Sequence, residues 1–180
     1  MAITNALTGC DYSALASKAL AGKDILAIVT NKAGTKLLAV AGQQGLSWEA
    51  SQETSEAATK DDNGGWTLNF HGAKSWNASI DGLYSPDDEA TQMVMAAMAN
   101  DEYLCLKICK RTIESTGVKY QPLRMGLAIV TTDSLDAANE DNATYSMEFT
   151  GSGKPWLYET ATEEERKAAA FTITSDDNEG

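Results

Sequence analysis

The sequence predicts a mainly β protein: a β-sandwich or partly closed barrel with one flanking α-helix and a long protruding loop. Runs in which apolar and polar residues alternate recur along the chain, for example at residues 46–50, 76–80 and 143–150. This period of two is typical of half-buried strands. The clearest helical signature lies at residues 85–100. Many strands, short turns and one such helix favour a sandwich or barrel.

Composition limits the classes of function. At 180 residues the chain is long enough for one domain with a substantial core. The formal net charge of −12 argues against binding to nucleic acid or to acidic membranes, because both depend on basic patches. It does not exclude nucleic acid that passes the surface without binding, and it is equally explained by solubility alone.

Neither a membrane segment nor a secretory signal is expected. No run of about 18 apolar residues is present, and residues 1–10 have neither a basic start nor an apolar segment. The cysteines are Cys10, Cys105 and Cys109. We interpret all of them as free thiols of a chain made in a reducing cytoplasm.

The first half of the chain begins with a short helix predicted at residues 11–20, with Asp11 as its N-cap. Whether this helix is an arm that packs on a neighbouring subunit or a cap on its own domain stays open. Residues 25–30 and 36–41 predict a hairpin around a turn at residues 31–35, which contains Gly34.

A long polar loop is predicted next, at residues 51–65, between the strand at residues 46–50 and strands at residues 66–70 and 76–80. None of its side chains is both apolar and larger than alanine, so the loop cannot build a core of its own. Loops beyond about 12–15 residues are usually functional or disordered. We therefore expect this projection to be ordered by something outside the subunit. His71, at a strand end, is interpreted as a surface residue.

The flanking helix is predicted to start with Ser85 as N-cap and Pro86 in the first turn, and to end near Asn100. Its apolar face comprises Ala90, Met93, Val94, Ala97 and Met98. Packing of this face on a sheet is favoured over an adaptable methionine-rich binding surface.

The second half continues as strands. Residues 102–112 and 125–132 predict strands, and residues 120–124 predict an edge segment because Pro122 cannot donate to a ladder. Residues 133–142 predict an exposed loop. In the strand at residues 143–150, the apolar side chains on one face are those of Tyr145, Met147 and Phe149.

The C-terminal part has a weaker pattern. It predicts a short strand at residues 156–158, a solvated helical turn or linker at residues 163–167, and a strand at residues 171–174 that adds to a neighbour. Residues 175–180 are acidic and expected to be disordered.

No motif for catalysis or for a cofactor is found. The sequence has no Gly-x-Ser-x-Gly elbow, no phosphate-binding glycine loop and no zinc-type spacing of cysteine and histidine. His71 is the only histidine. The run Asp61-Asp62-Asn63 lacks the spacing of a known calcium loop. We therefore predict no enzyme, no cofactor and no metal.

Five short motifs carry a family resemblance by their order and spacing. They are Gly22-Lys23-Asp24, Thr59-Lys60-Asp61, Gly72-Ala73-Lys74-Ser75-Trp76, Gly126-Leu127-Ala128-Ile129-Val130-Thr131-Thr132, and Ala143-Thr144-Tyr145-Ser146 continuing to Gly151-Ser152-Gly153. Over residues 22–153 the chain resembles the major tail tube proteins of long-tailed, non-contractile, siphovirus-type bacteriophages. The resemblance implies a β-sandwich that assembles into stacked hexameric rings around a channel.

The resemblance also implies partners and a location. The protein would bind itself and the tape-measure, tail-terminator and distal-tail proteins, and it would reside in the virion tail after assembly in the host cytoplasm. DNA would be passing cargo, repelled by acidic residues on the inner face. The expected division is an N-terminal arm or helix at residues 1–21, a tail-tube domain at residues 22–158, and an acidic extension at residues 159–180, partly disordered.

The candidate contacts between subunits or rings lie in and beside the long loop: Glu53, Glu56, Thr59, Lys60, Asp61, Asp62 and Trp66. The alternative is a monomeric β-sandwich that binds carbohydrate or peptide, with Trp66 and Trp76 as stacking platforms beside the loop. Self-association without a ligand distinguishes the two hypotheses.

Overall fold

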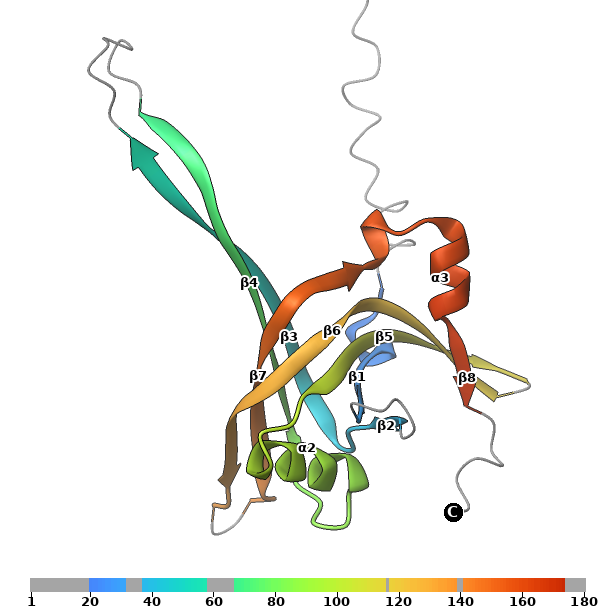
Figure 1. Cartoon of the computed structure of the whole chain (residues 1–180). Coiled ribbons are helices and arrows are strands. Elements are labelled where there is room, and N and C mark those ends of the chain that lie inside the picture. The colour runs from blue at the N-terminus through green and yellow to red at the C-terminus, as the bar shows by residue number, and fades with distance from the viewer. Residues whose placement is uncertain (1–19, 32–36, 58–66, 116, 139–140, 174–180) are drawn as a thin grey trace, which may run out of the picture.

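A computed structural model describes residues 20–31, 37–57, 67–115, 117–138 and 141–173 (Figure 1). The strands in these ranges are β1 (Ile25–Thr30), β2 (Leu37–Ala39), β3 (Gln43–Ala57), β4 (Leu68–Leu83), β5 (Leu104–Glu114), β6 (Gly117–Asp136), β7 (Thr144–Leu157) and β8 (Phe171–Ile173). The helices are the 3₁₀ turns η2 (Gly22–Asp24) and η3 (Tyr158–Thr160) and the α-helices α2 (Glu89–Ala99) and α3 (Glu163–Ala169). The helix predicted at residues 11–20 lies almost entirely outside the described residues, as do residues 174–180.

All strands belong to one 8-stranded antiparallel sheet with the order β2-β1-β5-β6-β7-β4-β3, and β8 pairs with β6 beside this path. Figure 1 shows the sheet as a curved, open surface, with α2 across one end of it. The mainly β class and the flanking helix are confirmed. So is the hairpin predicted over residues 25–41, because β1 pairs with β2. β1 also pairs with β5 from Ile25↔Lys110 to Thr30↔Cys105, a distant part of the sequence.

The main core lies between one face of the sheet and α2. It contains Leu104 and Leu106 of β5, the three apolar residues predicted on one face of β7, and the helix residues Ala90, Val94 and Ala97. Six large members on the strands are each no more than 2% exposed: Trp76, Ile80, Leu104, Leu106, Met147 and Phe149. Burial of side chains of this size typically contributes about 1.5–3 kcal/mol each. This core therefore fixes which face of the sheet is left to solvent.

Tyr145 completes the main core and joins β7 to the turn before β3. Its ring is 3% exposed, and its hydroxyl donates a 3.1 Å hydrogen bond to the carbonyl oxygen of Ala41. Burial raises the pKa of the Tyr145 phenol to about 12, and the nearby carboxylates of Asp88 and Asp81 add to the shift. The phenol therefore stays neutral and serves as a donor at any physiological pH.

A smaller cluster covers the opposite face of β1, β5 and β6, with Ile28, Cys109 and Tyr120 buried in it. The C-terminal segment supplies Phe171, whose ring stacks on Tyr120 at 5.3 Å. β8 pairs with β6 of its own chain from Val118↔Ile173 to Tyr120↔Phe171. The expectation that residues 171–174 add a strand to a neighbour is therefore wrong for the part that the structure describes.

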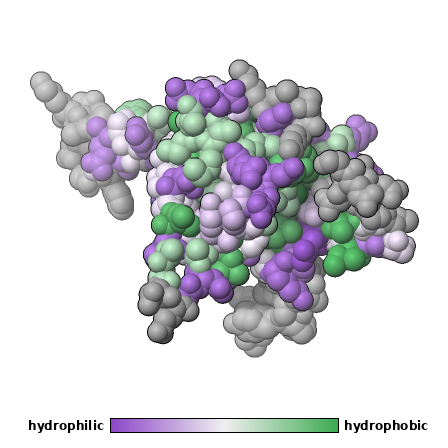
Figure 2. All heavy atoms as spheres, turned by 90° about the horizontal axis from the view of Figure 1, so that it is seen from below, coloured by the Kyte–Doolittle hydropathy of each residue, from purple (hydrophilic) through white to green (hydrophobic). Residues whose placement is uncertain are grey.

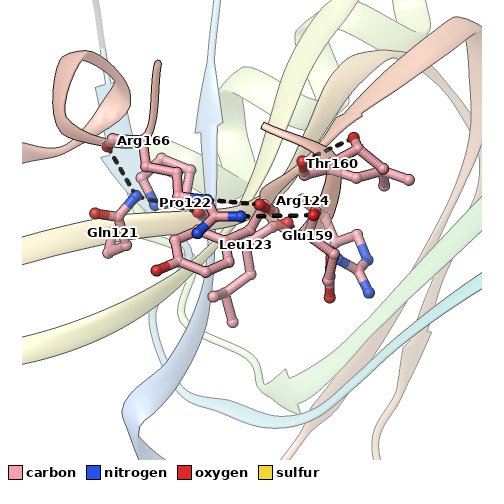
Figure 3. A network of polar contacts seen from close by, with 9 residues as sticks. Gln121, Pro122, Leu123, Arg124, Glu159, Thr160 and Arg166 are labelled. Atoms are coloured by element: carbon pink, nitrogen blue, oxygen red, sulfur yellow. Dashed lines mark hydrogen bonds and ion pairs between the residues drawn. The ribbon is translucent and has the colours of Figure 1, made fainter. Parts of the chain in front are cut away.

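Polar contacts hold the C-terminal segment against β6 (Figure 3). Arg124 forms an ion pair with Glu159, and the Nε2 of Gln121 donates a 3.1 Å hydrogen bond to the carbonyl oxygen of Arg166. The Nε of Arg166 donates to the carbonyl oxygen of Tyr158 at 2.8 Å. The hydrogen bond from Arg124 is the main cause that lowers the pKa of the Glu159 carboxyl. The helical turn predicted at residues 163–167 is confirmed as α3, with a capping box formed by Thr162 and Glu165.

The helix α2 begins later than predicted. Asp88 is the N-cap, and its carboxylate accepts hydrogen bonds from the backbone N–H and the hydroxyl of Thr91 at 2.9 and 2.6 Å. Ser85 instead accepts a turn hydrogen bond from the backbone N–H of Asp88, at 3.2 Å. The prediction of Ser85 as N-cap was therefore wrong, because an equally good cap follows three residues later. The end near Asn100 is confirmed.

Several predicted boundaries in the second half were also wrong. β6 continues to Asp136, so residues 133–136 of the loop expected at residues 133–142 belong to a strand. Residues 156–157 extend β7 rather than forming a separate strand. Residues 120–124 lie within β6. Pro122 sits beside a register shift with β5 and between the stretches of β6 that pair with β8 and β7, so the ladder there tolerates its missing donor.

Cys105 and Cys109 are free thiols on β5, as predicted; Cys10 lies outside the described residues. Burial raises the pKa of the Cys109 thiol from its ordinary value of 9.0 to about 12. The folded state thus favours the neutral thiol. This contribution to stability is present below about pH 9 and is lost as the pH rises through about 12.

We expect iodoacetamide at pH 8 to alkylate the half-buried Cys105 faster than Cys109, which should react only after unfolding, because the thiolate is the reactive form. Peptide mass spectrometry before and after addition of urea distinguishes the sites. Equal rates at both cysteines in the folded protein would contradict the burial of Cys109.

Candidate functional site

The most prominent surface feature is a two-stranded ribbon that projects from the sheet (Figure 1). β3 and β4 pair along their whole length, from Gln43↔Gly82 to Ala57↔Leu68. β7 pairs with β4 only over residues 77–83. Among the described residues, residues 51–57 and 68–75 therefore pair only with each other. We call these two stretches the arm; it extends about 23 Å beyond the sheet.

The prediction of a loop at residues 51–65 was wrong for the first seven of these residues, which belong to β3. The strands expected separately at residues 66–70 and 76–80 form one continuous strand, β4. Gly72 lies at the irregularity that shifts the register between Gln52 and Thr54. A Cβ atom on Gly72 would lie 2.9 Å from the Cβ of Glu53, so the close approach of the strands requires glycine.

Two of the predicted contact residues, Glu53 and Glu56, lie on the arm with exposed side chains. The other predicted contact residues lie outside the described residues: Thr59, Lys60, Asp61, Asp62 and Trp66. The arm also exposes two apolar side chains that were predicted only as part of a strand. Leu68 is 40% exposed and Phe70 is 53% exposed. His71 is exposed, as predicted.

Trp76 anchors the base of the arm. Its ring stacks on Trp48 of β3 with 4.2 Å between centroids, and its Nε1 donates a 3.0 Å hydrogen bond to the carbonyl oxygen of Gly153 on β7. The indole lies against Gly151, where a Cβ atom would come within 1.9 Å of the ring. At 2% exposure, Trp76 offers no ring face to a ligand. Its predicted role as a carbohydrate-stacking platform is wrong.

The face of β3, β4, β7 and β6 that does not contact the core is mostly polar, although Leu127 and Ile129 of β6 are exposed on it. Hydroxyl and carboxylate side chains link neighbouring strands across it: Ser47 with Ser79 at 2.9 Å, Ser146 to Asp81 at 2.6 Å, and Thr132 to Glu148 at 2.9 Å. We call the surface formed by these residues with Glu49 and Asn77 the polar face. A shallow groove of about 400 Å³ lies on it.

The charge of the polar face has one sign. Its strand stretches, residues 45–51, 75–81, 127–136 and 144–152, contain no lysine or arginine. They do contain acidic residues, among them Glu49, Asp81 and Glu148, which face solvent. The polar face therefore presents carboxylates without any basic side chain that would attract an anion.

The same four strands have two open edges. β3 is the last strand of the sheet, and within the described residues its 15 residues pair only with β4. β6 pairs with β5 only as far as Leu104↔Ala128. In the part of the chain that the structure describes, residues 129–136 of β6 thus pair on one side only, with β7. Open strand edges of this length are ready to pair with another chain.

The end of the molecule opposite the arm carries α2. Met98 was predicted to pack on the sheet, but its side chain is 43% exposed. Met95, which was not part of the predicted apolar face, is 46% exposed. Tyr103, just after the helix, is 41% exposed. We call these three residues the end patch. Figure 2 views the molecule from this end and shows hydrophobic side chains among hydrophilic ones.

None of the helices in the described ranges has the length and apolar character needed to cross a membrane.

Comparisons with known proteins give a consistent result. The family model described as "Phage tail tube protein" matches residues 19–156. No match was found among curated proteins. Solved structures with a similar fold include a chain of the virion of a native gene transfer agent particle, which has 17% identity and a TM-score of 0.60 and is matched over 77% of this chain and 98% of that chain.

Two further structures agree. The tail of an empty gene transfer agent particle, refined with C6 symmetry, has 20% identity and a TM-score of 0.58 over 77% of this chain and 98% of that chain. The SPP1 tail tube has 13% identity and a TM-score of 0.61 over 75% of this chain and 77% of that chain. At these identities the likeness concerns the fold.

Proposed function

Because the chain belongs to the phage tail tube protein family, we propose that β6, β7, β4 and β3 form the wall of its tube and that the polar face lines the channel. Membership makes the chain a structural protein of the virion tail and not an enzyme. The observation that supports the proposed arrangement is the pair of open edges on either side of these strands.

Ring closure would join the open edge of β3 to the open edge of β6 in the next subunit. The four strands alternate in direction, so β3 runs antiparallel to β6. Pairing between subunits then continues the antiparallel pattern without interruption. A contact between two different edges of identical subunits closes into a ring when the rotation between them fits. We propose six subunits in each ring, as in the C6-symmetric tail of similar fold.

The orientation of the wall follows from the core. One face of the sheet is covered by α2 and the buried side chains of the main core. The polar face is the one left to line a channel. Glu49, Asp81 and Glu148 would then repel the phosphates of passing DNA, and the lack of lysine and arginine would prevent the DNA from sticking.

The arm would contact a neighbouring ring through Glu53, Glu56 and the predicted residues Thr59, Lys60, Asp61, Asp62 and Trp66. In the complete tail we propose that a tape-measure protein occupies the channel and that tail-terminator and distal-tail proteins bind the two ends. The chain would therefore act through contacts with itself and with these structural proteins.

Electron microscopy and light scattering of the full chain, concentrated at moderate salt, test this proposal. We expect hollow tubes of uniform width, built of six-fold rings. In a reconstruction Glu49 and Glu148 should face the channel, and β3 should pair with β6 of the next subunit. Tubes with another inner face, or a monomer at every concentration and salt tested, would count against the proposed arrangement.

A further inference from the structure

Two clusters of exposed apolar side chains lie at opposite ends of the subunit. Leu68 and Phe70 lie near the distal end of the arm, whereas Met95, Met98 and Tyr103 form the end patch. Single exposed apolar residues are common on protein surfaces and need no explanation. Here their distribution is informative because the two clusters belong to the two extremities of one long hairpin and the helix that follows it.

The two clusters are well separated along the subunit. β4 runs without interruption from Leu68, on the arm, to Leu83, at the end from which the chain enters α2. At about 3.3 Å per residue this strand spans about 50 Å. Figure 1 shows the arm projecting from one end of the sheet and α2 lying at the other. No subunit can bring its own arm to its own end patch.

Neither cluster is used in the proposed ring. Ring closure joins the edges of β3 and β6 within the sheet, and the main core contacts Ala90, Val94 and Ala97 on the other side of α2. A surface at one end of a subunit and its complement at the other end form a head-to-tail contact. Such a contact repeats along a line instead of closing. A stack of rings requires this kind of contact along its axis.

We propose that the end patch is the docking site for the arm of a subunit in the adjacent ring, with Phe70 and Leu68 packing against Met95, Met98 and Tyr103. The proposal rests on the proposed tube and adds the surface that receives the arm. Methionine side chains are flexible and polarisable, and they form adaptable contacts with aromatic rings. In the proposed contact, Phe70 is the aromatic residue that packs against Met95 and Met98.

Charge does not provide the attraction in this contact. Glu53 and Glu56 flank the apolar residues of the arm, whereas Lys74 lies nearer its base, and Asp101 and Glu102 precede Tyr103 of the end patch. Like charges on the two sides repel at low ionic strength and are screened as salt is added. The apolar side chains must therefore supply the affinity, and stacking should become more favourable as salt increases.

Charged substitutions test the contact. Phe70→Glu and, separately, Met98→Glu should each abolish the stacking of rings while leaving the melting temperature unchanged, because both side chains are exposed. Ile113→Glu is the matched control. Ile113 is apolar and 76% exposed, but it lies near the β5–β6 turn, away from both clusters. The Ile113→Glu variant should form tubes as the wild type does, as measured by electron microscopy and sedimentation.

Cross-linking gives a test that does not depend on loss of assembly. In tubes of the double variant Phe70→Cys/Met98→Cys, oxidation should produce a ladder of linked subunits on a non-reducing gel. Phe70→Cys/Ile113→Cys should give no ladder beyond that of the variants with one introduced cysteine. The ladder should disappear when the variant is kept below the concentration at which tubes form.

The outcomes separate this inference from the proposed function. If the wild-type chain forms no rings or tubes, the proposed function fails and this inference fails with it. If wild-type tubes form but Phe70→Glu and Met98→Glu also form normal tubes, only the arm-to-patch contact is overturned. Tubes without a ladder in the Phe70→Cys/Met98→Cys variant overturn it as well.

Discussion

Replacement of Trp76 by alanine should destabilise the subunit by about 3–5 kcal/mol, the typical cost of removing a buried aromatic side chain. Folding free energies of single domains are about 5–15 kcal/mol, so the variant should lose much of its stability. The expected cost is large because the indole occupies the junction of β3, β4 and β7. Its loss would leave a cavity and also a carbonyl oxygen, that of Gly153, without its donor.

The measurement is urea unfolding followed by far-ultraviolet circular dichroism, since tryptophan fluorescence itself changes in the variant. Trp76→Phe is the matched control. It keeps an aromatic ring against Trp48 but removes the hydrogen bond from the indole, so its loss of stability should be clearly smaller. A loss below about 1 kcal/mol for Trp76→Ala would show that the stack does not hold the arm to the sheet.

Gly151 gives an independent check on the same junction. Gly151→Ala would place a Cβ atom 1.9 Å from the Trp76 ring, which requires the ring or the strand to move. Gly22→Ala meets no atom within 4 Å and serves as the control.

Removal of the arm should abolish tube growth and leave the fold intact. Residues 53–73 can be replaced by Asn-Gly, because Gln52 and Lys74 face each other in the ladder and Asn-Gly forms a two-residue hairpin turn. No residue of the main core is removed, since the core begins at Trp76 on β4. We expect a melting temperature within a few degrees of the wild type and no tubes by electron microscopy.

Rings should still form in this variant, because residues 43–50 of β3 and residues 129–136 of β6 keep their open edges. Light scattering and class averages from electron microscopy distinguish rings from tubes. If the truncated chain grew normal tubes, the arm would have no role in stacking. If it failed to fold, the arm would be part of the folded core.

The sequence predicts well those parts of the fold in which one face of a strand is buried. The alternation of Tyr145, Met147 and Phe149 placed β7 correctly, because burial on one side imposes a period of two. The arm lacks this signal. Both of its faces are exposed, so nothing selects apolar residues at alternate positions, and residues 51–57 resemble a loop. Separate strands were predicted at residues 66–70 and 76–80, whereas β4 is continuous and Gly72 allows close approach within it.

The candidate site was predictable only in part. The polar composition around residues 51–65 pointed to a projection, and Glu53 and Glu56 do lie on the arm. Their role in contacts between subunits stays a prediction. The acidic residues of the polar face could not be selected from sequence, because the pairing of β4 with β7 and of β7 with β6 decides which carboxylates share a surface. The exposure of Met98 could not be predicted from the sequence either, since helical spacing alone does not show where the sheet beneath a helix ends.

The distant pairings of the sheet have a consequence for the order in which the subunit folds. Thr30 of β1 contacts Cys105 of β5 across 75 positions of sequence, and Trp76 contacts Gly153 across 77. Folds dominated by such non-local pairings form slowly, in milliseconds to seconds. At about 5–20 residues per second of synthesis, β4 emerges several seconds before β7. During that delay β3 and β4 exist as a hairpin with both outer edges unpaired, so the subunit is most exposed to aggregation before its own chain is complete.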